Sequence, residues 1–119
     1  MERVNFITHQ NKQILHIDFS NSKPDEVLRV IEQAKAVIKK QPPNSVLTLT
    51  DSTGTRFDDE VTKSMKEYAA HNKPYVRAGA AIGITGLRKI IFEAILLFSS
   101  RKLATFDSID AAKDWLVSQ

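Results

Sequence analysis

Tyr75-Val-Arg-Ala-Gly-Ala-Ala-Ile-Gly-Ile84, then Thr85-Gly86, then Leu87-Arg-Lys-Ile-Ile-Phe-Glu-Ala-Ile-Leu-Leu-Phe98-Ser99, is the stretch that decides the fold. The run over 75–84 is short, apolar and bounded by Pro74 and Gly86, which predicts a strand buried on both faces. The run over 87–99 repeats apolar residues at steps of four, three and four, which predicts a helix whose core face is Leu87, Ile91, Ala94 and Phe98. A strand that turns directly into a helix is half of a parallel α/β unit.

The same alternation of strand and helix patterns extends to both sides of this stretch. A strand over 4–8, a polar turn over 9–13 and an alternating strand over 14–19 predict an N-terminal hairpin at one edge of the sheet. The remaining patterns predict helix 24–40, strand 46–51, helix 58–72, strand 75–84, helix 87–99, strand 103–106 and helix 109–117. We therefore predict a single α/β domain over 1–119: an open, mostly parallel five-stranded sheet with four helices on its two faces.

Two local details of these elements can be predicted as well. The serines of Ser20-Asn-Ser22 offer a cap for the first helix, Pro24 suits its first turn, and Asp58 caps the second helix. Strict alternation along the central strand divides its residues between a small face, with Gly79, Ala81 and Gly83, and a larger one, with Val76, Ala78, Ala80, Ile82 and Ile84.

The amino-acid composition excludes several classes of protein and of site. The chain of 119 residues is 42% hydrophobic and 26% charged, and these are ordinary values for a globular domain. It contains no cysteine, which excludes disulfides, thiolate metal sites and a cysteine nucleophile. Its first residues lack the apolar core of a signal peptide and no segment is apolar enough to span a membrane, so we expect a cytoplasmic protein. The net charge of +3 is spread along the chain, and we expect no nucleic-acid partner.

The loops that follow the strands are the candidate functional surface. In open parallel sheets, ligands bind at the carboxyl ends of the strands. Here those ends are followed by residues 20–22, 51–57, 84–87 and 107–108, where small and polar residues gather. Strand-to-helix loops also need caps and glycines for purely structural reasons, and that alternative explains about half of the signal.

Cations at the start of the predicted helix 87–99 mark a candidate anion site. Arg88 and Lys89 lie in the first turn, where the helix dipole disfavours each cation by about 0.3–1 kcal/mol. An anion or acidic partner held by the exposed amides after Thr85 and Gly86, with Arg56 nearby on the same rim, would explain their placement. The alternative is that two solvated side chains tolerate a small cost.

The same helix carries an apolar pair on its outer side. With its core face turned to the sheet, Phe92 and Leu96 project outward one turn apart. Such a pair predicts self-association, with a homodimer contact as the main hypothesis, or an apolar ligand. The alternative is that the N-terminal hairpin or the last helix covers it.

Catalytic and cofactor-binding patterns are weak. Asp51, Ser52 and His71 include the residue types of a hydrolytic triad, but a helix of this length separates Ser52 from His71 by about 20 Å. The glycines over 79–86 lack the lysine and hydroxyl of a phosphate-binding loop and the spacing of a dinucleotide site. No residues have metal-ligand spacing. We therefore predict a protein that is not an enzyme and has no cofactor or metal.

The sequence also resembles a known family. The order of elements, with Asp51-Ser52-Thr53-Gly54 closing a strand, resembles the STAS fold, whose best-known members are the bacterial anti-sigma factor antagonists. A set of segments is similar to the SpoIIAA-like group of small bacterial STAS/lipid-transfer-type proteins: Asn72-Lys-Pro-Tyr-Val-Arg-Ala-Gly-Ala-Ala-Ile-Gly-Ile-Thr-Gly-Leu87, Ser99-Ser-Arg101-Lys, Phe106-Asp107 and Ala112-Lys-Asp-Trp115-Leu116.

The resemblance implies a regulatory module that binds a protein partner. In the antagonists the hydroxyl before the corresponding glycine is phosphorylated, which here implies Thr53, with Ser52 and Asp51 beside it in a switch loop ending at Gly54. The chain departs from that pattern after Gly54, where Thr55-Arg-Phe-Asp58 replaces a direct entry into the helix and makes the loop longer. The alternative function is a small binding protein for a lipid or other amphipathic anion.

Overall fold

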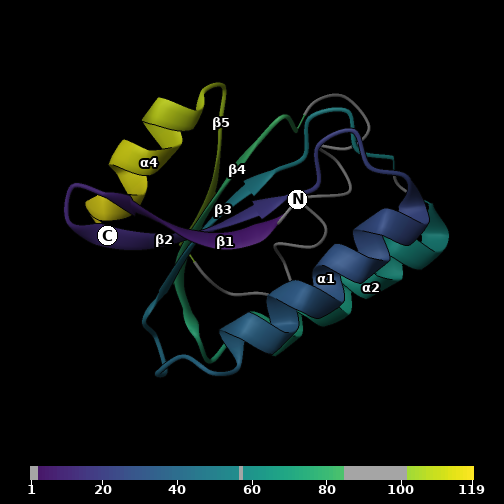
Figure 1. Cartoon of the computed structure of the whole chain (residues 1–119), viewed down its shortest axis with the longest axis horizontal. Helices are drawn as coiled ribbons and strands as arrows, with labels where there is room; N and C mark the ends of the chain where they lie inside the picture. Colours follow the sequence, from purple (N-terminus) through teal and green to yellow (C-terminus); the bar gives the residue numbers. More distant parts are fainter. Residues whose placement is uncertain (1–2, 57, 85–101) are drawn as a thin grey trace.

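The computed structural model of the chain describes residues 3–56, 58–84 and 102–119 (Figure 1). These residues form β1 (Val4–His9), β2 (Lys12–Asp18), α1 (Pro24–Ile38), β3 (Val46–Asp51), α2 (Asp59–Asn72), β4 (Val76–Ile82), β5 (Lys102–Phe106) and α4 (Ile109–Val117). The predicted helix 87–99 lies outside the described residues. Every other predicted element is present, with ends that differ from the prediction by no more than a few residues.

The strands form one sheet in the order β1-β2-β3-β4-β5. β1 and β2 pair antiparallel, whereas β2–β3, β3–β4 and β4–β5 pair parallel. This arrangement confirms the predicted open, mostly parallel five-stranded sheet with the N-terminal hairpin at one edge. The hairpin turn has two residues, Gln10 and Asn11, with φ of 49° and 66°. Positive φ at both positions is the turn geometry that matches the twist of the flanking strands.

Helices cover both faces of the sheet and make two cores. α1 and α2 lie together on one face and α4 lies on the other (Figure 1). The first core combines Leu15 and Ile17 of β2 with buried residues of α1 and α2, and the second combines Ile14 and Leu49 with α4. None of the helices within the described ranges is long and apolar enough to cross a membrane.

A bulge at the start of β4 changes the predicted division of its side chains. Val46 pairs with Val76, but the next residue of β3, Leu47, pairs with Ala78, so Arg77 is an extra residue on β4. Val76 therefore packs in the core under α1 and α2, whereas Ala78 packs in the core under α4. The prediction that both share one face is wrong because alternation in a sequence does not reveal an inserted residue.

Gly79 lies where the sheet leaves no room for a side chain. A Cβ at this position would collide with Cδ2 of Leu103 on β5 and approach Oγ1 of Thr48 on β3 to 2.8 Å. The small face predicted for the central strand therefore serves close packing against the neighbouring strands.

The start of α1 also differs from the prediction. The N-cap is Lys23, whose N–H donates to the carboxylate of Glu26 at 3.4 Å, and Pro24 follows at the first helical position. Ser22 is buried and donates instead to the carbonyl of Ser20. The cap of α2 was predicted correctly, since the Asp58 carboxylate accepts from the N–H of Val61 at 2.8 Å.

Candidate functional site

The carboxyl ends of the parallel strands lie together at one end of the sheet. The pairing aligns Asp18 with Asp51, Asp51 with Ile82, and Ile82 with Phe106. The loops that follow β2, β3, β4 and β5 therefore start at the same end of the sheet, which we call the rim. The predicted surface residues Thr85, Gly86, Arg88, Lys89, Phe92 and Leu96 lie outside the described residues.

Backbone hydrogen bonds hold the loop after β3 between its neighbours. The N–H of Phe19 donates to the carbonyl of Asp51 at 2.8 Å, and the N–H of Asn21 donates to the carbonyl of Thr53 at 2.8 Å. On the other side, the N–H of Ser52 donates to the carbonyl of Ile82 at 2.9 Å. Main-chain hydrogen bonding thus continues past the end of β3, both to the segment after β2 and to the end of β4. Residues 51–56 contain the predicted switch loop, 51–54, and are fixed by main-chain contacts. We use the name switch loop for the whole segment 51–56.

Thr55 closes the switch loop into a tight turn. Its N–H donates to the carbonyl of Ser52 at 3.1 Å, and its buried Oγ1 donates to the carbonyl of Phe19 at 2.7 Å. Gly54 has φ of 68°, and a Cβ there would collide with Oδ1 of Asn21. The extra residues between Gly54 and α2 are therefore used to return the chain to the loop after β2, which leaves Thr53 and Gly54 exposed at the tip.

The structure separates the two hydroxyls that the sequence placed side by side. Ser52 is only 1% exposed, whereas Thr53 is exposed. The N–H of Thr53 donates to a carboxylate oxygen of Asp51 at 3.0 Å, which orients the tip of the loop. Of these two side chains, Thr53 is the one that another protein can reach.

Gly83 supports the tip from the end of β4. Its φ is 76°, and a Cβ there would collide with N, Cα and Oγ1 of Thr53. The backbone of the switch loop therefore rests directly on the glycine, and this contact brings the ends of β3 and β4 together. Sequence analysis identified Gly83 only as a small residue of the strand.

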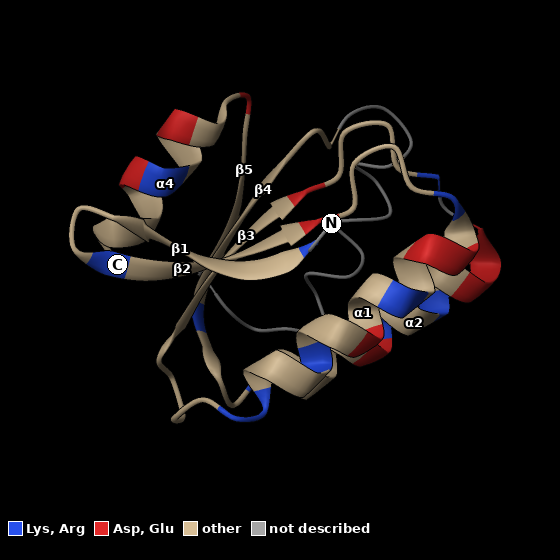
Figure 2. Cartoon of the chain, viewed as in Figure 1, with Lys and Arg blue, Asp and Glu red and all other residues tan. Residues whose placement is uncertain are grey.

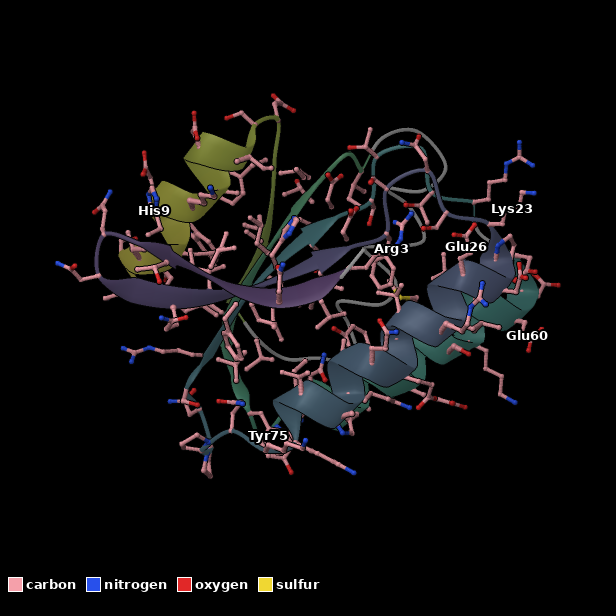
Figure 3. All side chains as sticks on the ribbon, viewed as in Figure 1. Arg3, His9, Lys23, Glu26, Glu60 and Tyr75 are labelled. Carbon is pink, nitrogen blue, oxygen red and sulfur yellow. The ribbon has the colours of Figure 1, made fainter. Side chains whose placement is uncertain are left out.

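A second polar cluster on the rim was not predicted. Arg3 donates through Nη1 to the carbonyls of Asp18 and Ser20 at 3.2 and 3.1 Å, and it lies 3.8 Å from the Asp18 carboxylate (Figure 3). The same carboxylate accepts from the N–H and the hydroxyl of Ser20. Arg3 precedes the first strand, and no pattern in the sequence connects it with the end of β2.

The cluster changes the acidity of Asp18. Burial by itself would raise the pKa of this carboxyl group, but the hydrogen bonds from Ser20 and the electrostatic interactions with Arg3 and His16 outweigh burial and hold the pKa below its ordinary value. Asp18 therefore remains ionised and ties the N-terminal segment to the loop that supports the switch loop.

Charge is distributed unevenly around the rim. The helices α1 and α2 both begin there, and their first turns and caps carry the acids Asp25, Glu26, Asp58, Asp59 and Glu60 (Figure 2). Lys23 and the predicted rim residue Arg56 are exposed beside them. The acids complement the helix dipoles, and they outnumber the basic side chains around the starts of α1 and α2 within the described part of the chain.

The residues of the hypothetical triad are not brought together. Ser52 is buried at the end of β3, whereas His71 lies in the last turn of α2, with its Nδ1 2.9 Å from Oδ1 of Asn72 and its ring against Tyr75. Figure 3 places Tyr75 at the end of the sheet opposite Arg3. Within residues 3–56, 58–84 and 102–119, no three histidine or acidic side chains are grouped as metal ligands.

Two adjoining hollows lie at that opposite end. One, of about 430 Å³, is lined by residues of β1, β2, β3 and the segment after α1: Phe6, Gln13, Gln41, Pro42, Ser45, Val46 and Leu47. The other, of about 220 Å³, shares Gln13, Ser45 and Leu47 and adds Lys12, Arg77 and Gln119. The apolar residues of the first hollow thus adjoin the cations Lys12 and Arg77 of the second, at the end of the sheet away from the rim.

Comparison with known proteins identifies the class of fold. The chain has the STAS fold: it superposes on the solved structure of an anti-sigma-factor antagonist (STAS) domain protein from Planctomyces limnophilus with a TM-score of 0.63. The superposition covers 96% of this chain and 97% of the other, at 10% sequence identity. No protein-family model and no curated protein matches the sequence. The likeness confirms the fold that the sequence resemblance implied.

The support of Thr53 by Gly83 can be tested by substitution. A non-glycine residue in the left-handed conformation costs about 1–3 kcal/mol. Gly83→Ala should lower the free energy of unfolding by more than this, because the new Cβ also collides with backbone atoms of Thr53. Gly54→Ala is the matched control, since its φ is similar but its Cβ meets the end of a side chain. Urea unfolding measures both, and equal losses would contradict the contact.

The charge of Asp18 can be tested through pH. Because its folded pKa is depressed, Asp18 contributes stability that is present above the unfolded pKa of about 3.9 and is lost as the pH falls through the folded value. Asp18→Asn should therefore lower the free energy of unfolding at pH 7 by about 1–3 kcal/mol. The difference between wild type and variant should shrink as the pH falls below about 4. A difference that is independent of pH would contradict this assignment.

Proposed function

We propose that the chain is a cytoplasmic, non-enzymatic regulatory module that binds a protein partner through the rim, and that phosphorylation of Thr53 switches this contact. The observation that carries the proposal is the position of Thr53, exposed at the tip of a loop whose backbone is hydrogen-bonded to the segments on both sides of it. The neighbouring structure is an antagonist domain protein with the same fold, which supports an interaction role for the rim.

A phosphate on Thr53 would alter the loop for two physical reasons. It adds nearly two negative charges next to the Asp51 carboxylate, which already accepts from the N–H of Thr53. The hydroxyl that would carry it lies beside Gly83, so close that a Cβ on residue 83 would collide with Oγ1. The phosphorylated side chain would therefore turn away from Gly83, and the packing of the tip on Gly83 would change. This predicts a switch that acts on loop conformation as well as on charge.

The surface around Thr53 suggests the chemistry of the partner. Acidic residues at the starts of α1 and α2 flank the switch loop, so a basic surface on the partner would be attracted to the rim. Phosphorylation then adds charge of the same sign as the rim, and the conformational change decides whether the contact is strengthened or lost.

Modification of Thr53 can be tested in the protein isolated from its own host. Peptide mass spectrometry should find a phosphate on Thr53, which is lost in Thr53→Ala and kept in the matched control Ser52→Ala, because the Ser52 hydroxyl is buried. A phosphate on another residue, or none in any growth condition, would contradict the switch.

The rim contact can be tested separately by crosslinking. A photoreactive amino acid at Arg56 should capture the partner in cells, whereas one at Lys40, at the far end of α1, should not. Capture of the same protein from both positions would contradict a contact specific to the rim.

A second candidate function is binding of a small amphipathic anion. The adjoining hollows offer Phe6 and Val46 for an apolar tail and Arg77 and Lys12 for a charged group. Native mass spectrometry of the same host preparation distinguishes the two functions, because a co-purified acyl compound adds a mass that denaturation removes, whereas a phosphate remains attached.

A further inference from the structure

The two hollows at the end of the sheet opposite the rim adjoin and form one groove. They share Gln13, Ser45 and Leu47, so the hollow of about 430 Å³ beside Phe6 continues into the hollow of about 220 Å³ beside Arg77. The strand order places β2 and β3 between these two side chains. We call the joined hollows the end groove, and it crosses the sheet from β1 to β4.

The side chains along the end groove are accessible from solvent. Phe6 is 42% exposed, and Lys12, Gln13, Ser45 and Arg77 are exposed as well. These residues stand at both ends of the groove and in its middle. A ligand can therefore reach the whole length of the groove without any rearrangement of the chain.

Main-chain hydrogen bonds fix the floor of the end groove. The N–H groups of Ser45 and Val46 both donate to the carbonyl of Tyr75, at 2.9 and 3.0 Å. The hydroxyl of Ser45 donates to the carbonyl of Pro42 at 2.6 Å. The segment after α1 is thus tied to the start of β4, and a ligand meets a surface that is already formed, which lowers the ordering cost of binding.

The bulge in β4 adds one side chain to this groove. Val46 pairs with Val76 and Leu47 pairs with Ala78, so these four residues would form an uninterrupted ladder if Arg77 were absent. The extra residue is therefore not needed for the register of the sheet. Bulges redirect side chains and are frequent next to functional sites. Here the redirected side chain is an arginine that lines the groove.

The guanidinium of Arg77 is free to bind a ligand. The ion pairs and side-chain hydrogen bonds within residues 3–56, 58–84 and 102–119 do not include it. Lys12, the other cation of the groove, already donates to the carbonyl of Val117 at 2.6 Å. A free guanidinium offers a planar fork of donors that fits the two oxygens of a carboxylate.

Other cations at this end of the molecule favour an anionic ligand. Lys39 and Lys73 are the C-caps of α1 and α2, which both begin at the rim and end on the side of the groove. Both lysines are exposed, and so is Lys40 beside them (Figure 2). The helix dipoles account for their positions, and their charges also attract an anion towards the groove.

We propose that the end groove binds a linear acyl carboxylate, with its carboxylate on Arg77 and its tail crossing β3 and β2 to Phe6. Neighbouring strands are about 4.8 Å apart, so β1 and β4 are separated by about 14 Å, the length of an extended tail of about twelve carbons. The apolar groups of Val46, Leu47 and Phe6 lie along this path. The assignment rests on the second candidate function, binding of an amphipathic anion, and is independent of Thr53.

Calorimetric titration of the purified chain with sodium octanoate tests the head-group residue. Arg77→Gln should bind octanoate about tenfold more weakly than wild type, because a hydrogen-bonded charge is lost. Arg56→Gln is the matched control, since it makes the same change of charge at an exposed arginine on the rim and should bind like wild type. Octan-1-ol has the same tail without the carboxylate, and its weak binding should be equal in all three proteins.

Chain length tests the path of the tail. A fully buried methylene is worth about fourfold in affinity, so binding to wild type should tighten from octanoate to decanoate to dodecanoate. Phe6→Ser should reduce this gain and leave the affinity for octanoate unchanged, because the shorter tail ends before β1. On addition of dodecanoate, the backbone amide resonances of Phe6, Val46 and Arg77 should shift, whereas that of Thr53 should not.

Three results would overturn the assignment. If Arg77→Gln binds as tightly as wild type, or if Arg56→Gln weakens binding and the amide shifts occur at the rim, the end groove is not the site, although the chain still binds an amphipathic anion. If none of the three carboxylates binds at millimolar concentration, the proposed ligand class is wrong. The second candidate function is then decided separately by the native mass spectrometry of the host preparation.

Discussion

The contact of Thr53 with Gly83 is the constraint on which the rim depends. The loop after β3 can pair with the segment after β2 and with the end of β4 only if its tip lies directly on the backbone of residue 83. Only a residue without Cβ, in a left-handed conformation, allows that approach. Because this packing fixes Thr53 in an exposed position and turns Ser52 inward, it decides which hydroxyl is available on the surface.

The proposed interaction surface at the rim is defined by main-chain geometry more than by reactive side chains. At the rim, hydrogen bonds between backbone groups present Thr53 among acidic helix starts.

The sequence predicted the fold well because periodicity and turn residues report on each element separately. It could not reveal features that depend on how elements meet. The bulge at Arg77 reverses the side of Val76 without disturbing the apolar pattern, and Arg3 reaches Asp18 from outside any predicted element. The family resemblance selected Thr53 by its position before Gly54, but the burial of Ser52 and the exposure of Thr53 follow only from the packing of the loop. The predicted rim over 51–57 was located by the topological rule for parallel sheets, whereas the role of Gly83 required coordinates.

Nuclear Overhauser spectroscopy of the labelled protein in solution tests the central contact most directly. If the switch loop rests on the end of β4, the α protons of Gly83 should show strong cross-peaks to the amide and side-chain protons of Thr53. Cross-peaks between Gly83 and its sequence neighbours, with none to Thr53, would contradict the account of the rim.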